Sequence, residues 1–321
     1  MGIKLIKGGM LSSFQDSGRI GYRKDGVVVS GAMDQDALKL GNLLLGNEAG
    51  LAGLECTLTG PELLFEGDAL IAITGGDLSA EMDGFPVHMW RPVMARKGAV
   101  LSFGQAIAGC RAYLCVQGGV NLNPVLGSSS TYLAAGFGGF LGRALKKGDQ
   151  IAFNQEIPRL PVHMNWGLSP DLYTATDRNI IRVMKGPEFE LFREKSIADL
   201  FISEFRISMA ADRMGYRLEG PILELKVAKE MLSSAVAFGT VQVTAEGSPI
   251  VLMADHQTTG GYPRILQVLN VDLGKLAQLR SGALIQFELQ DLKQAQGLLI
   301  SREKEMNQLK QSLTFKYIPH D

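Results

Sequence analysis

The 321-residue chain has little of three things: charge of one sign, cysteine and long apolar runs. Its 32 Lys and Arg and 33 Asp and Glu leave a net charge of −1, whereas nucleic-acid-binding proteins usually show a clear basic excess. No apolar stretch approaches the ~18 residues that cross a membrane, and the N-terminal segment lacks the features of a signal peptide. The sequence therefore predicts a cytoplasmic protein that binds neither nucleic acid nor membrane.

Recognisable catalytic and ligand-binding motifs are also scarce. The three cysteines, Cys56, Cys110 and Cys115, are an odd number without metal-ligand spacing, which argues against a disulfide framework. The four histidines lie far apart in the sequence, and neither an H-E-x-x-H motif nor a phosphate-binding P-loop is present. We therefore predict no metal site and little activity of this chain on its own.

Glycine, in contrast, is abundant. It accounts for 38 of the 321 residues, above the usual share of about 7%, and it is spread along the whole chain. Glycines scattered between short apolar runs indicate many tight turns, as a β-rich protein needs. The length favours two domains, which we place at residues 1–165 and 166–321, with the join inside 158–179.

Three segments have the spacing of helices, and several short apolar runs have the character of strands. Asp34 is a suitable N-cap for a helix over 34–45. A second helix is predicted to begin at Pro187, and a third, amphipathic helix to run over 291–313, packing on its own domain or on a partner. The clearest strands are predicted at 69–74, 99–104, 113–119, 240–244 and 249–254.

Two short segments of the first half recur in the second half. Residues 96–103 resemble 280–287, and residues 58–63 resemble 218–223. Internal similarity of this kind indicates related structural repeats. The two offsets differ, so we interpret the repeats as two related β-rich domains with different insertions.

Polar and glycine residues gather at two places in the first half. Arginine and aspartate near flexible turns, as in 15–34, can bind a carboxylate or phosphate. The hydroxyl run 125–131 either donates to an oxyanion or forms a polar loop. The candidate residues here are Gln15, Asp16, Arg19, Tyr22 and Ser128.

Two further clusters lie in the second half. Arg213 and Arg217 are four residues apart and either clamp an anion or form a salt-bridged edge of little energetic value. The richest cluster follows the apolar run 249–254, where Asp255 either serves a function or caps the turn. Its other candidates are His256, Gln257, Thr258, Thr259 and Tyr262.

A glycine-rich run occupies residues 136–143. Its spacing fails the G-x-G-x-x-G pattern of dinucleotide-binding loops. It is either a loop between strands or a backbone cradle for an anion.

These clusters resemble the allophanate hydrolase subunit 2 family, also called the biotin-dependent carboxyltransferase family. Its members include the C subunit of 5-oxoprolinase, the antagonist of a sporulation kinase inhibitor, and the carboxyltransferase part of urea carboxylase. The resemblance covers about residues 9 to 290, and the last two matching blocks are highly specific. The blocks lie at 15–23, 30–34, 55–61, 118–119, 126–128, 142–143 with 148–149, 212–218 and 255–263.

The resemblance implies a mainly β fold with some α, made of two related cyclophilin-like β-barrel domains. Among the family members the chain is most similar to the C subunit of 5-oxoprolinase. This implies a multi-subunit complex, with homologues of the B and A subunits, that opens the lactam of 5-oxoproline to L-glutamate with ATP hydrolysis. ATP, with Mg²⁺, is then expected to bind within the complex.

The implied chemistry suggests roles for the matching residues. A lactam resists hydrolysis, and phosphorylation of its oxygen makes a better electrophile, which requires cations and donors around the phosphoryl group. Asp255 or His256 would move protons, or Asp255 would help to hold a metal. The candidate cations are Arg19, Arg213 and Arg217, and the candidate donors are Ser128, Thr258 and Thr259.

Two other functions stay open. A biotin-dependent carboxyltransferase of the urea carboxylase type would need a separate biotin carrier, because this chain has no biotinyl-lysine motif. A regulatory protein would instead bind and sequester the homologue of the B subunit. The chain departs from the family at Ser234, where an acidic residue is common, and at Thr244, where proline is common, so the substrate contacts near the fourth cluster are expected to differ.

Overall fold

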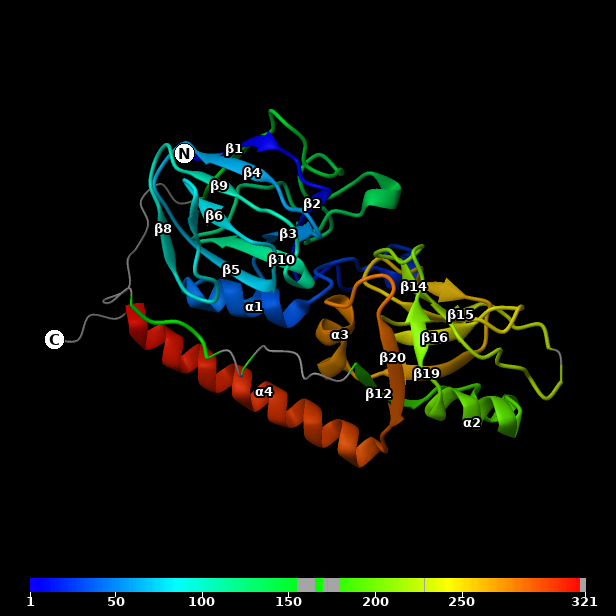
Figure 1. Ribbon diagram of the computed structural model, residues 1–321. Coiled ribbons are helices and arrows are strands. Elements are labelled where there is room, and N and C mark those ends of the chain that lie inside the picture. The colour runs from blue at the N-terminus through cyan, green and yellow to red at the C-terminus, as the bar shows by residue number, and fades with distance from the viewer. Residues whose placement is uncertain (155–164, 170–171, 173–178, 228, 318–321) are drawn as a thin grey trace. The chain divides into compact units, whose positions relative to one another are not determined.

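The computed structural model describes residues 1–321 except 155–164, 170–171, 173–178, 228 and 318–321 (Figure 1). The described part is mainly β with some α, as the sequence indicates. It divides into two compact units. Unit 1 contains Met1–Ile20, Ser30–Thr174 and Glu305–Asp321, and unit 2 contains Gly21–Val29 and Ala175–Lys304. The domain boundaries given above stay a prediction, and most of the expected join at 158–179 lies outside the described residues.

Unit 1 is built on two antiparallel sheets that enclose one apolar core. The six-stranded sheet has the order β11 (Gln150–Ala152), β1 (Gly2–Lys7), β4 (Glu62–Phe65), β9 (Val100–Ser102), β6 (Glu81–Met82) and β7 (Phe85–Pro86). The five-stranded sheet has the order β2 (Leu11–Gln15), β3 (Gly53–Thr57), β10 (Ala108–Val116), β5 (Ala69–Asp77) and β8 (Val93–Ala95). Both sheets contribute side chains to a single buried cluster, among them Ile3, Phe65, Phe14 and Ile73.

Helix α1 (Gln35–Leu44) confirms the helix predicted at 34–45. It packs on the other face of the five-stranded sheet. Successive residues of a strand face opposite sides, so β5 gives Ile71 to the inner core and Leu70 to the helix. The side chain of Asp34 accepts a hydrogen bond from the Ala37 N–H at 3.0 Å and caps the helix. The family segment 30–34 therefore leads directly into α1.

Unit 2 is a closed barrel of seven strands. Their order is β12 (Ile180–Lys185), β19 (Arg264–Val268), β16 (Thr240–Val243), β17 (Pro249–Leu252), β14 (Gly215–Glu219), β13 (Phe205–Ile207) and β20 (Leu284–Leu289). Helices α2 (Glu194–Ile202) and α3 (Asn270–Ala277) belong to the same unit. A separate two-stranded sheet pairs β15 (Ser234–Ala235) with β18 (Thr259–Gly260).

Three predicted elements differ from the structure. The strand expected at 113–119 lies at Ala108–Val116 as β10, because the chain turns at Gly118 and Gly119, whose φ angles are +73° and +77°. The strand expected to stop at Gly75 continues to Asp77 as part of β5, which pairs with the equally long β10. The helix expected from Pro187 is a short 3-10 turn, Phe189–Leu191, followed by extended backbone before α2 begins at Glu194. The helix is broken at Phe192, which is buried and forms an isolated antiparallel β-bridge with Leu225. This pairing holds Phe192 in an extended conformation.

One of the two sequence repeats marks the same turn in both units. Gly98 has a φ of +89° and donates to the Phe65 carbonyl at 2.8 Å. Gly282 has a φ of +87° and donates to the Ile207 carbonyl at 2.7 Å. The other repeat falls at different places, since Gly60 precedes β4 whereas Gly220 follows β14.

The C-terminal helix α4 (Leu292–Thr314) belongs to both units, because unit 1 begins again at residue 305. Its Leu313 and the following Tyr317 are buried in the cluster around α1. The Tyr317 hydroxyl donates to the Leu44 carbonyl at 2.7 Å, at the end of α1. Among the described residues, the helices are all too short or too polar to pass through a lipid bilayer.

Tyr317→Phe should lower the free energy of unfolding of unit 1 by about 1 kcal/mol, because the buried Leu44 carbonyl loses its donor. Both tryptophans, Trp90 and Trp166, lie in unit 1, so urea unfolding followed by tryptophan fluorescence measures this unit. Phe315→Leu, at a side chain that is 60% exposed, is the control and should change the value by less than about 0.5 kcal/mol. Equal unfolding midpoints for the two variants would contradict the proposed anchor.

Candidate functional site

The candidate residues fall into two groups, one in each unit. Gln15, Asp16, Arg19 and Ser128 belong to unit 1. Tyr22, Arg213, Arg217, Asp255, His256, Gln257, Thr258, Thr259 and Tyr262 belong to unit 2. The first cluster, continuous in sequence, is therefore divided after Ile20, and each group has its own surroundings.

Asp16 fixes the loop 125–131 to the end of β2. Its carboxylate accepts hydrogen bonds from Gly18 N–H at 2.7 Å, Ser128 Oγ at 2.8 Å and Ser129 N–H at 2.6 Å. The Ser130 hydroxyl donates to the same carboxylate. The hydroxyl run predicted as a second cluster thus joins the first cluster, and its donors are directed at Asp16.

Arg19 binds the backbone of the same loop, 125–131. Its side chain is 0% exposed, and it donates to the Val125 carbonyl through Nε and the Ser130 carbonyl through Nη2, both at 2.9 Å. Its guanidinium lies 4.7 Å from the centroid of the Phe137 ring, a favourable cation–π distance. Gln15 also binds the backbone of this loop, since its side-chain amide donates to the Thr131 carbonyl at 3.1 Å.

A buried carboxylate positions the segment 30–34. Glu55 accepts from the Met33 N–H at 2.9 Å and from the Tyr113 hydroxyl at 2.8 Å. The same hydroxyl accepts from the Asp34 N–H at 2.7 Å. Burial raises the pKa of Tyr113 well above its usual range, so the hydroxyl stays protonated and keeps donating to Glu55.

Arg213 and Asp255 form a buried ion pair in unit 2. Arg213 donates from Nε and Nη2 to the two carboxylate oxygens of Asp255, at 2.8 and 2.9 Å. Their side chains are 5% and 4% exposed, and the Asp255 N–H donates to the Arg213 carbonyl at 2.8 Å. Neighbouring Asp212 caps the turn by accepting from the Met214 N–H at 2.8 Å.

Of the three arginines predicted as cations, Arg213 and Arg217 belong to unit 2 and lie in different surroundings. The charge of Arg213 is balanced by Asp255, whereas Arg217 is exposed on β14. Both oxygens of Asp255 accept from Arg213. Across the described ranges, no group of three or more His, Cys, Asp or Glu is placed to hold a metal ion.

His256 is presented by the same loop as a neutral hydrogen-bond acceptor. The side chain is 4% exposed, and Nδ1 lies 2.5 Å from the Gln257 carbonyl oxygen. Since a carbonyl only accepts, Nδ1 must carry the proton and Nε2 is left with a lone pair. Burial is the largest effect and lowers the pKa of His256, and the hydrogen bond to the Gln257 carbonyl opposes it. The smaller charge effects of Arg23 and Asp255 lower and raise the pKa, respectively.

Two residues near His256 were assigned no role from the sequence. Arg23, in the segment Gly21–Val29 of unit 2, donates to the Val236 carbonyl. Gln242 of β16 is 2% exposed, donates to the Tyr262 carbonyl at 3.0 Å and accepts from Gln257 Nε2 at 3.3 Å. An alternating strand predicts an outward polar residue at Gln242, but nothing in the sequence shows that a loop covers it.

The remaining candidates differ in accessibility. Thr258 is partly buried, and its carbonyl accepts from the Val236 N–H at 3.2 Å. Thr259 is exposed in β18, and Tyr262 is 46% exposed. Unit 2 therefore brings Arg23, His256 and Thr258 into one neighbourhood with accessible hydroxyl groups beside it.

The model of the carboxyltransferase domain, subdomain A and B, matches residues 25–289. The chain belongs to this family. It is 41% identical over 300 residues to the C subunit of 5-oxoprolinase from Haemophilus influenzae, covering 93% of this chain and 94% of that protein. It is 39% identical over 299 residues to the C subunit of 5-oxoprolinase from Escherichia coli, covering 91% and 93%. The chain is also similar to the structure of the Kluyveromyces lactis urea carboxylase, at 30% identity and a TM-score of 0.89. This match covers 96% of the present chain and 29% of the longer urea carboxylase chain.

Asp255→Asn should lower the free energy of unfolding of unit 2 by about 3–5 kcal/mol, because the buried Arg213 would lose the opposite charge of Asp255, with which it forms a two-point ion pair. The double variant Arg213→Met, Asp255→Leu should recover much of this loss, since it removes both charges. Urea unfolding followed by circular dichroism measures both. Glu224→Gln in the exposed pair Arg193–Glu224 is the control and should cost no more than about 1 kcal/mol; an equal cost for Asp255→Asn would contradict this interpretation.

His256 should also make stability depend on pH. Its folded pKa is lowered, so below pH 6.5 the unfolded chain takes up a proton that the folded chain resists. The free energy of unfolding should therefore fall as the pH drops below 6.5 and show no contribution from His256 above it. His256→Gln should flatten this dependence, whereas His88→Gln, at an exposed position, should retain it; identical pH profiles for the wild type and His256→Gln would refute the lowered pKa.

Proposed function

We propose that the chain is one component of an ATP-dependent 5-oxoprolinase that acts with homologues of the A and B subunits. The supporting observation is the similarity to two proteins named as the C subunit of 5-oxoprolinase, which are 41% and 39% identical to this chain. Each alignment covers more than nine-tenths of this chain and of the relative. A match of this extent leaves no large part of those relatives without a counterpart here. The proposed reaction opens the lactam of 5-oxoproline to L-glutamate.

The proposed place of chemistry is the loop that presents His256. In the first step the lactam oxygen attacks the γ-phosphorus of ATP, ADP leaves, and the lactam N–H proton passes to Nε2 of His256. A neutral histidine can accept this proton at pH 7 because burial lowers its pKa. One water then adds to the ring carbon of the O-phosphorylated intermediate, the C–N bond breaks as the nitrogen takes back the proton from His256, and the ring opens to an acyl phosphate. A second water attacks this acyl phosphate in the complex, which releases phosphate and gives L-glutamate.

Other residues of this loop have positioning or binding roles in the proposal. The Arg213–Asp255 pair fixes the backbone directly before His256. Gln242 fixes the backbone after it, through the Tyr262 carbonyl and the Gln257 side chain. Arg23 supplies positive charge near His256, where a phosphoryl group carries negative charge.

A biotin-dependent carboxyltransferase is the second candidate. It is favoured by the description of the family and by the structural match to urea carboxylase. The chain spans 29% of that enzyme, so this function would also require a biotin carrier and a carboxylase outside residues 1–321. A regulatory protein that binds the homologue of the B subunit is the third candidate.

The deciding experiment mixes the purified chain with homologues of the A and B subunits and follows glutamate release from 5-oxoproline. We expect release that needs ATP and stops when this chain is omitted. Absence of turnover from a stable complex would overturn the proposal. Carboxyl transfer from a biotinylated carrier would then indicate the second function, and complex formation without either reaction the third.

A further inference from the structure

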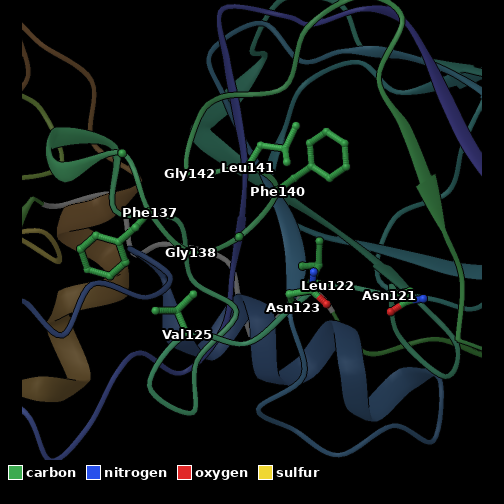
Figure 2. A pocket seen from close by; sticks show the side chains of 11 residues that line it. Asn121, Leu122, Asn123, Val125, Phe137, Gly138, Phe140, Leu141 and Gly142 are labelled. Atoms are coloured by element: carbon green, nitrogen blue, oxygen red, sulfur yellow. The ribbon is translucent and has the colours of Figure 1, made fainter.

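Unit 1 contains a hollow of about 340 Å³ that none of the proposed catalytic residues lines. Figure 2 shows Leu122 and Asn123 on one bordering segment and Phe140 and Leu141 on the other. The second segment is the glycine-rich run 136–143, for which the sequence left a plain loop and an anion cradle open. The volume lies within the range of roughly 300–1,000 Å³ that is usual for small-molecule sites.

Four successive residues that line the hollow have backbone N–H groups without an acceptor among the described residues. They are those of Gly138, Gly139, Phe140 and Leu141, and none donates a hydrogen bond to any residue that the structure describes. Gly138 and Gly139 are buried. Buried backbone N–H groups are nearly always paired with protein, water or ligand, so these point to an acceptor from outside the chain.

The backbone conformation suits an anion. The φ angle is +52° at Gly139, negative at Phe140 and +56° at Leu141. Gly138 also has a positive φ, of +74°, so the sign alternates over 139–141 only. Such alternation turns successive N–H groups towards one point, as in a concave anion-binding nest. A positive φ is uncommon for leucine and tends to occur where function requires it.

Packing beneath the loop makes this conformation obligatory. A Cβ atom at Gly138 would lie 2.2 Å from the Ser130 carbonyl oxygen and 2.7 Å from Nη2 of Arg19. A Cβ atom at Gly139 would lie 1.9 Å from Oγ1 of Thr131. Gly138 therefore packs against the guanidinium of the buried Arg19 and the Ser130 carbonyl, and Gly139 packs against Thr131. The contact at Gly138 places a positive charge next to the loop.

We propose that this hollow binds the oxyanion group of a small ligand, a carboxylate or a phosphate, through the N–H groups of residues 138–141. The apolar part of the ligand contacts the side chains of Leu122 and Phe140, and the amides of Asn121 and Asn123 border its polar part. Arg19 is a positioning residue, because it holds the Val125 carbonyl and the Phe137 ring rather than lining the hollow.

The test is titration of the full ¹⁵N-labelled chain with inorganic phosphate, 5-oxoproline or L-glutamate, followed by the amide resonances of residues 138–141. We expect saturable shifts at these resonances with at least one ligand. Shifts with phosphate alone identify a phosphate site, and shifts with the two amino-acid carboxylates alone identify a carboxylate site. No saturable shift with any of the three overturns the proposal, independently of whether the complex turns over 5-oxoproline.

Two matched pairs of variants locate the site. Asn121→Asp with Asn123→Asp adds two negative charges at the exposed rim and should weaken binding about tenfold or more. Asn307→Asp on exposed α4 adds a charge elsewhere and should leave binding unchanged. Phe140→Ala keeps the 140 N–H but removes an apolar contact and should weaken binding only in part, whereas Phe140→Pro also removes the N–H and should abolish binding. Equal affinity across each pair would place the ligand elsewhere and overturn the proposal.

Discussion

The buried ion pair between Arg213 and Asp255 is the interaction on which the proposed catalytic loop depends. It joins the turn before β14 to the residue directly ahead of His256, 42 positions later in the chain. The side chains are almost fully removed from water, so loss of one partner removes an opposite charge from a group that water does not reach. The ion pair thus links the two most specific family blocks, 212–218 and 255–263, to each other.

Unit 1 uses polar residues in the same way. Asp16 accepts four hydrogen bonds from 18 and 128–130, and Arg143 forms a two-point ion pair with Asp149 at 2.7 Å for each bond. The family blocks 142–143 and 148–149 are explained by that pair. Many motif residues of this family therefore hold loops in place, and the groups left for chemistry are the ones these loops present.

The sequence predicted the mainly β architecture, α1 and α4, because periodicity and capping are local properties. It also located the residues of both groups through their resemblance to the family. It could not show that Ser128 is directed at Asp16, or that Arg213 is neutralised by Asp255, because those contacts join segments far apart in the chain. Gln242 was missed for the same reason, since an outward polar residue in a strand gives no sign of the loop that covers it.

The sequence left the glycine-rich run undecided between a loop and an anion cradle. Glycine content alone cannot separate the two, because tight turns need the same residue. The structure adds the positive φ angles at Gly139 and Leu141, the buried Arg19 beneath, and the neighbouring hollow. These properties arise from the packing of Arg19, Ser130 and Gly138 against one another. They favour an anion-binding loop over a plain turn.

The most direct test of the proposed chemistry is the kcat of the reconstituted complex with His256→Gln, measured at pH 8 together with the free energy of unfolding. At that pH His256 is neutral and makes no pH-dependent contribution to stability. The proposal predicts a fall in kcat of about 10²-fold or more in a variant that keeps its fold and its partners. Full turnover by a folded His256→Gln complex would contradict the assignment of His256 as the proton acceptor.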